Sequence, residues 1–234
     1  MEIKKGKFYA VSTGVGDPEL ITLKALRILK ETKVWAVPVS PNGSSTVLHI
    51  VEGLVDCSEK KMLMLKTAMS TAKDVLQHFH DEQANEIEQA LGQGEDVAMI
   101  SLGDVSLYST AAYIVEKLMA KGYECAMIPG VTSACAAACA LNLSLADMKE
   151  AVHIIPAAYG DMDEALSLKG TKVLMKSGKS LSGLLDKIRE KGLSENAALV
   201  ANCGMENEVL CRDINEMDKM TGYFTTVVVK DKEV

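Results

Sequence analysis

Short apolar runs that end near glycine or proline alternate with helical segments along this chain. Residues 7–12 form such a run, and residues 18–30 carry leucines at helical spacing behind Asp17 and Pro18, which suit a helix start. The further strands of this half are expected at 34–37, 60–65, 96–101 and 124–128, and the further helices at 45–55, 71–91, 107–121 and 131–141. Pro38 is expected to end the second strand. A repeated strand–helix order predicts a mostly parallel sheet that helices cover on both faces.

The second half restarts the pattern and ends differently. Its strands are expected at 152–155, 172–176 and 197–202, and its helices at 162–168 and 181–191. Two later apolar runs, 208–211 and 223–230, have no helical period between them, which predicts an antiparallel hairpin in a mixed sheet. With a boundary expected near 142–149, the sequence predicts two α/β domains, 1–142 and 143–234.

Composition and charge exclude several classes of function. The chain has 234 residues, 48% of them hydrophobic, and a net charge of −7, which argues against a nucleic-acid surface. No apolar run approaches the ~20 residues of a membrane span. The start of the chain leads into a strand rather than a signal-peptide core, and the six cysteines form no CxxC pair. We therefore expect a cytoplasmic protein without a membrane or nucleic-acid partner.

Three glycine-bearing loops follow predicted strands. The first, 12–19, lacks the third glycine of a dinucleotide-binding fingerprint because Glu19 stands there, and no acidic residue ends the next strand. The other two loops are 101–110 and 128–133. Taken singly, each loop is better explained as a plain turn between a strand and a helix than as a binding site. Since parallel strands end at one edge of a sheet, the three loops together predict a ligand-binding rim.

At these loops the chain resembles the tetrapyrrole (corrin/porphyrin) methylase family over essentially its whole length. The family's opening pattern GxGxGDPxLLTLKA is similar to residues 11–25, its GDP segment to 103–105, and its PG-(I/V)-(T/S)-(S/A) segment to 129–133. Val15 and Val105 stand where relatives have proline, which changes loop stiffness. Within the family, features such as Tyr-Ser-Thr at 108–110 and Val-Leu-Met-Lys at 173–176 resemble the branch that methylates carbon 20 (C20) of precorrin-2 or cobalt-factor II during cobalamin biosynthesis.

The resemblance implies two α/β domains with a cleft between them, in which S-adenosylmethionine binds in a bent pose as methyl donor. By the resemblance, the expected cofactor contacts are Leu102, Gly103, Asp104, Leu107, Thr132, Ser133, Met175, Lys176, Ala201 and Asn202. The expected substrate contacts are Val15, Gly16, Ser106, Tyr108, Ser109 and Thr110. A homodimer is also implied.

No general base is nominated by the sequence. Asp104 and Tyr108 lie near the expected site, but Asp104 reads at least equally well as a carboxylate that shapes its loop by accepting backbone N–H bonds. The tetrapyrrole is rich in carboxylates, whereas the chain is acidic and has only three arginines. Lysines such as Lys66 and Lys176, together with hydroxyls and backbone amides, are candidates to bind those carboxylates.

The sequence predicts no metal site of the protein's own. His78 and His80 fall on different faces of the predicted helix, because positions i and i+2 do not face each other. His49 and His153 are single, so a hydrogen-bonded histidine is the first interpretation and axial ligation of substrate cobalt a minor one. Cysteines in the alanine-rich stretch 131–141 suit close helix packing better than zinc.

Other functions stay open on the sequence alone. The nearest is another enzyme of the same family that methylates a different corrin carbon, or a protein side chain as the diphthamide-pathway relative does. A non-catalytic tetrapyrrole-binding protein and an NAD-dependent oxidoreductase are alternatives of other classes. Binding of S-adenosylhomocysteine without binding of NAD would distinguish the methylase from both.

Overall fold

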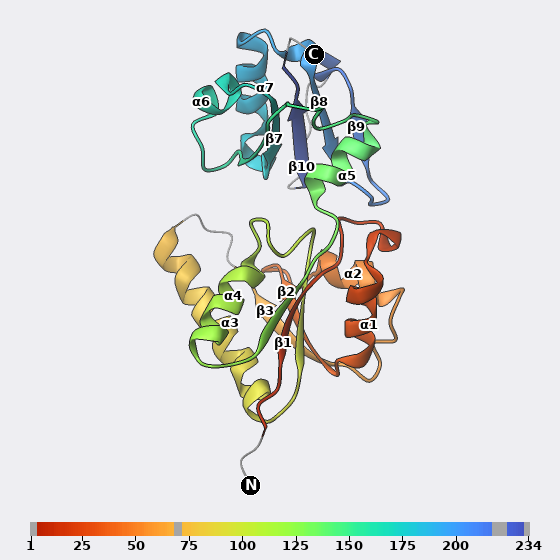
Figure 1. Ribbon diagram of the computed structural model, residues 1–234, viewed down its shortest axis with the longest axis vertical. Helices are drawn as coiled ribbons and strands as arrows, with labels where there is room; N and C mark the ends of the chain where they lie inside the picture. The colour runs from red at the N-terminus through yellow and green to blue at the C-terminus, as the bar shows by residue number, and fades with distance from the viewer. Residues whose placement is uncertain (1–3, 68–71, 217–223, 232–234) are drawn as a thin grey trace. The chain divides into compact units, whose positions relative to one another are not determined.

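The computed structural model describes residues 4–67, 72–216 and 224–231 of the chain. The chain forms two compact units, Met1–Thr132 and Ser133–Val234, each built on one five-stranded sheet (Figure 1). The division falls before helix α5 (Ser133–Ala140), not near residue 142 as expected. The reason is that α5 packs on strands β8 (Ala197–Ala201) and β10 (Thr225–Val229) of the second unit.

The first unit has an all-parallel sheet in the strand order β3-β2-β4-β1-β5. The strands are β1 (Phe8–Ser12), β2 (Val34–Val39), β3 (Lys61–Lys66), β4 (Val97–Ser101) and β5 (Cys125–Ile128). The helices are α1 (Leu23–Glu31), α2 (Thr46–Glu52), α3 (Lys73–Gly92) and α4 (Thr110–Ala120). Helices α1 and α2 lie on one face of the sheet, and α3 and α4 on the other (Figure 1). The predicted parallel sheet with two covered faces is confirmed.

Burial on both faces explains why the central strands β1, β2 and β4 of this unit are recognisable in the sequence. All five residues of β4 are buried, so the strand reads as a continuous apolar run. Each face has its own core, one with Leu65, Ile87 and Leu118 and the other with Leu29 and Trp35. A buried aliphatic side chain of this size contributes about 1.5–3 kcal/mol, so these two layers supply much of the unit's stability.

Three local expectations for the first unit differ from the structure. The helix expected at 18–30 is split into a 3-10 turn, Pro18–Leu20, and α1, because the Thr22 hydroxyl caps α1 by accepting from the Ala25 N–H at 3.2 Å. The helix expected from residue 107 begins at Thr110, after Tyr108 adopts a φ of 51°. The remaining difference concerns Pro38.

Pro38 lies inside β2 and does not end it. On one side, β2 pairs with β3 through Val39, in register with Lys66. On the other side, β4 pairs with β2 only at Val34–Ala36. The proline, which cannot donate a hydrogen bond, is therefore tolerated because the ladder with β4 has already ended there.

The second unit has a mixed sheet in the strand order β6-β7-β10-β8-β9. Its further strands are β6 (Val152–Pro156), β7 (Thr171–Met175) and β9 (Val209–Cys211), and its further helices α6 (Met162–Ser167) and α7 (Leu181–Glu190). Short 3-10 turns lie at Gly178–Ser180, Ser194–Asn196 and Ile214–Glu216. Strands β6 and β7 are parallel, whereas β10 is antiparallel to both β7 and β8. The predicted mixed sheet is confirmed.

The hairpin expected from runs 208–211 and 223–230 is wrong. Strand β10 lies between β7 and β8, whereas β9 pairs with the far side of β8. Burial explains the arrangement, because all five residues of β10 are buried, as a central strand requires, while Val209 and Leu210 of β9 are exposed. Residue 223 of the expected strand, like residue 71 of the expected helix 71–91, lies outside the described residues.

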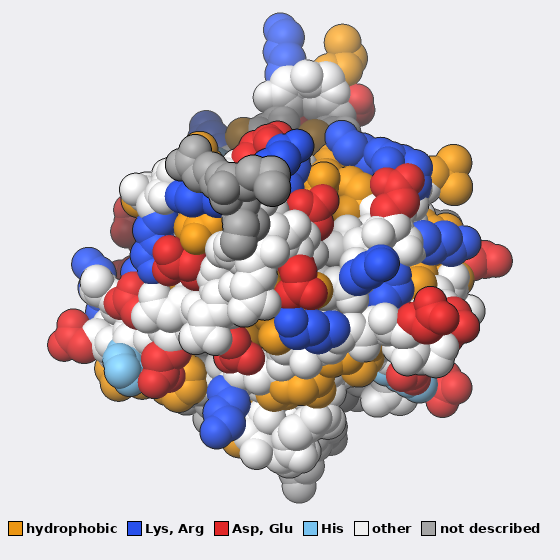
Figure 2. Space-filling view, turned by 90° about the horizontal axis from the view of Figure 1, so that it is seen from below, with side chains coloured by type: hydrophobic (Ala, Val, Ile, Leu, Met, Phe, Trp, Pro, Cys, Tyr) orange, Lys and Arg blue, Asp and Glu red, His pale blue; other side chains and the backbone are white. Residues whose placement is uncertain are grey.

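Charged side chains of both signs occur on the face of the molecule shown in Figure 2. On the face shown in Figure 2, acidic and basic side chains are interspersed rather than gathered by sign. Among the described helices, none has both the length and the apolar character needed to cross a bilayer.

A buried lysine stabilises the second sheet through one ion pair. Lys172 of β7 is 1% exposed, and its Nζ donates to Asp231 at 2.6 Å and to the Leu168 carbonyl at 3.2 Å. Asp231 also accepts from the Gly170 N–H at 2.5 Å. The hydrogen bond from Lys172 and the one from Gly170 hold the pKa of Asp231 below its usual value.

We expect Asp231→Asn to destabilise the second unit more than Lys172→Met does. The first change leaves a buried ammonium unpaired, at a cost of about 3 kcal/mol, whereas the second leaves a carboxylate that can turn to solvent. Urea unfolding of both variants at pH 7 measures the difference.

The pH dependence gives a second measurement on the same variants. Because the folded pKa of Asp231 is lowered, its stabilisation is present above about pH 4 and is lost as the pH falls through the folded value. The Asn variant should therefore lose less stability than the wild type on acidification. Equal losses in both proteins would contradict the assignment.

Candidate functional site

The carboxyl ends of β4, β1 and β5 lie side by side at one edge of the first sheet. Strand β1 is the middle of the three, with Ser12 in register with Ser101 of β4 and Val11 in register with Ile128 of β5. Three loops therefore leave the sheet next to one another: 13–17, 102–109 and 129–132. We call this set of loops the rim.

Backbone hydrogen bonds join the first two loops of the rim. The Gly103 N–H donates to the Gly14 carbonyl at 2.7 Å, and the two glycines form an isolated antiparallel bridge. Both have a left-handed φ, 75° for Gly14 and 74° for Gly103, which favours glycine. Thr13 adds two bonds, from its N–H and its hydroxyl, to the carbonyl of Ser101 at 2.9 and 3.1 Å. These contacts fix the first loop against the second.

The carboxylate of Asp104 joins the second loop to the third. One oxygen accepts from the Gly130 N–H at 2.7 Å, and the other accepts from the N–H of Ser106 at 2.8 Å and from its hydroxyl. Burial alone would raise the pKa of Asp104, but the bonds from Ser106 and Gly130 outweigh burial and lower that pKa. The group is therefore an ionised hydrogen-bond acceptor at neutral pH, which supports the interpretation as a loop-shaping carboxylate.

The third loop can approach only because residue 130 is glycine. A Cβ on Gly130 would lie 2.4 Å from Cβ of Ser12 and 3.0 Å from the Gly103 carbonyl oxygen. The Ser12 hydroxyl is itself buried and accepts from the Val105 N–H at 3.0 Å. Ser12 and Thr13 were not singled out from the sequence, although hydroxyl residues at a buried strand end were the available signal.

Tyr108 adds backbone strain to the rim. Its φ of 51° is left-handed although it is not glycine, and its side chain is exposed. The next residue, Ser109, caps α4 by accepting from the Ala111 N–H at 3.2 Å. A non-glycine residue in this region costs of order 1 kcal/mol or more and is frequent at functional sites.

The second unit has two comparable strand ends. Strands β7 and β8 run in the same direction because both are antiparallel to β10, so Met175–Lys176 and Ala201–Asn202 lie at one edge of that sheet. Lys176 and Asn202 have left-handed φ values of 56° and 52°. Met175 and Ala201 are buried, and burial lowers the pKa of the Lys176 amine. The Asn202 N–H donates to the Phe224 carbonyl at 2.8 Å.

The predicted site residues thus fall into two groups. The rim and the first turn of α4 bring together Val15, Gly16, Leu102, Gly103, Asp104, Ser106, Leu107, Tyr108, Ser109, Thr110 and Thr132. The second unit carries Ser133, Met175, Lys176, Ala201 and Asn202. Of the rim residues, Val15 is buried, whereas Ser106 and Tyr108 are exposed.

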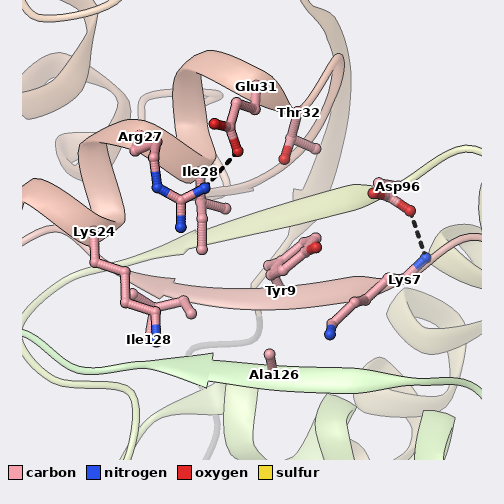
Figure 3. A pocket seen from close by; sticks show the side chains of 10 residues that line it. All are labelled: Lys7, Tyr9, Lys24, Arg27, Ile28, Glu31, Thr32, Asp96, Ala126 and Ile128. Atoms are coloured by element: carbon pink, nitrogen blue, oxygen red, sulfur yellow. Dashed lines mark hydrogen bonds and ion pairs between the residues drawn. The ribbon is translucent and has the colours of Figure 1, made fainter.

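A pocket of about 230 Å³ lies elsewhere in the first unit, along β1 and β5 beside α1 (Figure 3). Tyr9 and Ala126 reach it from the strands, while Arg27, paired with Glu31 at 2.7 Å, reaches it from α1. The described residues that line it include none of those predicted for cofactor or substrate. The rim is therefore a separate feature.

The histidines considered as metal ligands have other contacts. His78 lies 3.2 Å from Glu82, and His80 stacks on Tyr113 with ring centroids 4.7 Å apart. The ring of His153 is 2.8 Å from the Lys169 carbonyl oxygen, and His49 is 2.7 Å from Glu52. Within the described part of the chain, no three His, Cys, Asp or Glu side chains gather as metal ligands would.

Similarity to known proteins covers nearly the whole chain. A probable cobalt-precorrin-2 C(20)-methyltransferase of Methanocaldococcus jannaschii is 31% identical over 228 residues, 96% of each chain. A cobalt-precorrin-2 C(20)-methyltransferase of Salmonella typhimurium is 28% identical, again over 96% of each chain. A uroporphyrinogen-III C-methyltransferase of Pseudomonas aeruginosa is 27% identical over 94% of this chain and 89% of its own.

Solved structures share the fold. The uroporphyrin-III C-methyl transferase of Thermus thermophilus, complexed with S-adenyl homocysteine, superposes with a TM-score of 0.70 at 19% identity and covers 97% of this chain and 98% of its own. The sequence model of the tetrapyrrole (corrin/porphyrin) methylases matches residues 7–216. With three joined glycine loops at the ends of parallel strands and a match of this length, the chain belongs to the tetrapyrrole (corrin/porphyrin) methylase family.

Proposed function

We propose that this chain transfers a methyl group from S-adenosylmethionine to C20 of precorrin-2 or cobalt-factor II in cobalamin biosynthesis. The near full-length similarity to two proteins named as C20-methyltransferases of cobalt-precorrin-2 carries the choice of carbon. The uroporphyrinogen-III C-methyltransferase at 27% identity is the reason to keep a second candidate, a family enzyme acting at another ring position.

The rim suits a cofactor held mostly by backbone groups. At Gly103, with its left-handed φ, a Cβ would meet no atom within 4 Å, so the space that a side chain would fill is open to a ligand. The surrounding loops offer peptide groups and the hydroxyls of Ser106 and Ser109. We assign the cofactor contacts to Leu102, Gly103, Asp104, Leu107, Thr132, Ser133, Met175, Lys176, Ala201 and Asn202.

Methyl transfer of this kind depends more on aligning the methyl group with C20 than on general acid–base catalysis. When bound, S-adenosylmethionine supplies a methyl group that its sulfonium already activates. C20 of the tetrapyrrole forms the new carbon–carbon bond as the carbon–sulfur bond breaks, and C20 later loses its proton. The rim would position the methyl group and exclude water. Substrate contacts are proposed at Val15, Gly16, Ser106, Tyr108, Ser109 and Thr110, and a homodimer and a cytoplasmic location stay predictions.

Incubation with precorrin-2, with and without bound cobalt, and a ¹³C-methyl donor tests the function. We expect the product's NMR spectrum to show the label on C20, in one or both reactions. A label on another carbon would favour the second candidate. Calorimetry supplies the control: binding of S-adenosylhomocysteine but not NAD is expected, and binding of neither would favour a tetrapyrrole-binding protein.

We expect Asp104→Asn to weaken S-adenosylhomocysteine binding by roughly 10- to 100-fold, because an amide cannot accept on both sides and a hydrogen bond to a charged group contributes about 1.5–3 kcal/mol. Calorimetry at pH 7 measures the change. If Asp104 were instead the general base, the methylation rate would fall with unchanged affinity, and the wild-type rate would titrate with this carboxyl. Because its pKa is lowered, the contribution of Asp104 to binding should persist through neutral pH and be lost only on acidification.

The variant Gly130→Ala tests whether close packing of the rim loops is needed for cofactor binding, apart from any effect on the stability of the protein. The new methyl group would overlap Ser12 and press on the Gly103 carbonyl, so the loops must part and cofactor affinity should fall at least tenfold. Gly183→Ala in α7 is the matched control, because a Cβ there meets nothing within 4 Å and alanine favours a helix by about 1 kcal/mol. Equal affinities for S-adenosylhomocysteine in the two variants would contradict the close approach at Gly130.

A further inference from the structure

Strand β3 is the outer strand of the first sheet on the side away from the rim's β5. It pairs with β2, where the Lys61 N–H donates to Lys33 and the Thr67 N–H to Val39, at 2.9 and 3.0 Å. In a parallel pair, successive residues direct their backbone N–H and C=O groups alternately toward the partner strand and away from it. Lys61 and Thr67 donate to β2, so the peptide groups of Met62 and Met64 point away from β2. An edge of this kind can accept a further strand.

A groove of about 470 Å³ lies between this edge and α3. Met64 and Lys66 line it from the strand, and Phe79, Glu82 and Glu86 from the helix. The lining is thus apolar at Met64 and Phe79, basic at Lys66 on the strand and acidic at Glu82 and Glu86 along α3. Glu82 and Glu86 are exposed and one helical turn apart.

Gln83 is the unusual member of the groove. The residue is 4% exposed, and its Nε2 donates to the Lys66 carbonyl at 2.7 Å, which fixes the orientation of the amide. Its Oε1 is buried, and none of the described residues donates to it. A buried acceptor without a donor costs about 1–3 kcal/mol, so this atom is a ready site for an incoming N–H.

We propose that the groove binds an extended, basic segment of a partner protein, which adds to β3 as a sixth strand. The segment donates a backbone N–H to Oε1 of Gln83 and pairs with the edge at Met62 and Met64, beside which no other described strand lies. Alternate residues of a strand are about 6.6 Å apart, close to the ~6 Å rise between Glu82 and Glu86 on the helix. A Lys-Xaa-Lys spacing therefore matches both carboxylates.

Charge argues against a second copy of this chain as the occupant. Two β3 edges related by a two-fold axis would form one continuous sheet and keep both α3 helices on the same face. The rows containing Glu82 and Glu86 of the two copies would then face each other, and like charges in this position are unfavourable. A basic segment meets the same carboxylates with opposite charge.

The test uses the peptide Val-Lys-Val-Lys-Val-amide, with fluorescein attached to its N-terminal amine so that both lysines keep their charge, and the full chain. We expect saturable binding by fluorescence anisotropy, no binding of the matched peptide with glutamate in place of lysine, and weaker binding as salt rises. The double variant Glu82→Gln/Glu86→Gln should weaken binding roughly fivefold, as two partly exposed ion pairs would. Glu116→Gln on α4 makes a charge change outside the groove and should leave binding unchanged.

Gln83→Met tests the buried acceptor. We expect peptide affinity to fall roughly fivefold, as for one lost hydrogen bond, while the unfolding midpoint changes little, because the variant removes the unsatisfied oxygen together with the bond from Nε2 to the Lys66 carbonyl. Hydrogen exchange should show that the peptide protects the amides of Met62 and Met64. Equal binding of the acidic peptide, protection confined to other residues, or a dimer in sedimentation velocity that Met64→Lys dissociates would each overturn the proposal.

Discussion

The parallel pairing of β1 with both β4 and β5 is the constraint on which the site depends. It brings the ends of three strands to one level of the sheet, where hydrogen bonds such as Gly103 to Gly14 and Gly130 to Asp104 hold the loops together. The bond to the carboxylate contributes about 1.5–3 kcal/mol and the backbone bond about 1. Neither could form if a strand slipped by one residue, because every side chain would then move to the other face.

Local patterns predicted the first unit well because its central strands β1, β2 and β4 are buried on both faces. The run at β4 and the glycine loops after it are visible as sequence, and parallel order follows from the alternation with helices. The order of the second sheet is not local information. Nothing in the run that forms β10 says that it enters between β7 and β8, and alanine-rich α5 has no apolar stripe to show which sheet it covers.

The candidate site likewise has features that the sequence predicted and features that it did not. Glycines and prolines mark a loop in the sequence, so the rim residues were predicted as a set. The hydrogen bonds that join the loops were not predicted. The bond from the Val105 N–H to the Ser12 hydroxyl, for example, connects residues that are 93 positions apart in the chain, so no local pattern indicates it. The sequence left Asp104 open between a general base and a loop-shaping carboxylate, and its three hydrogen-bond donors favour the second role.

Among the described residues, three of the five non-glycine residues with a left-handed φ follow the carboxyl ends of strands, and the other two lie between α5 and β6. Tyr108, Lys176 and Asn202 each hold a left-handed φ directly beyond or near a strand end, at a cost of order 1 kcal/mol each. A strained residue persists only where its neighbours fix it, as the cap at Ser109 and the Asn202–Phe224 bond do. These conformations do not stabilise the fold, since a turn with ordinary φ values would have a lower conformational free energy. Their recurrence at corresponding strand ends is what a chain selected to present backbone groups to a ligand would show.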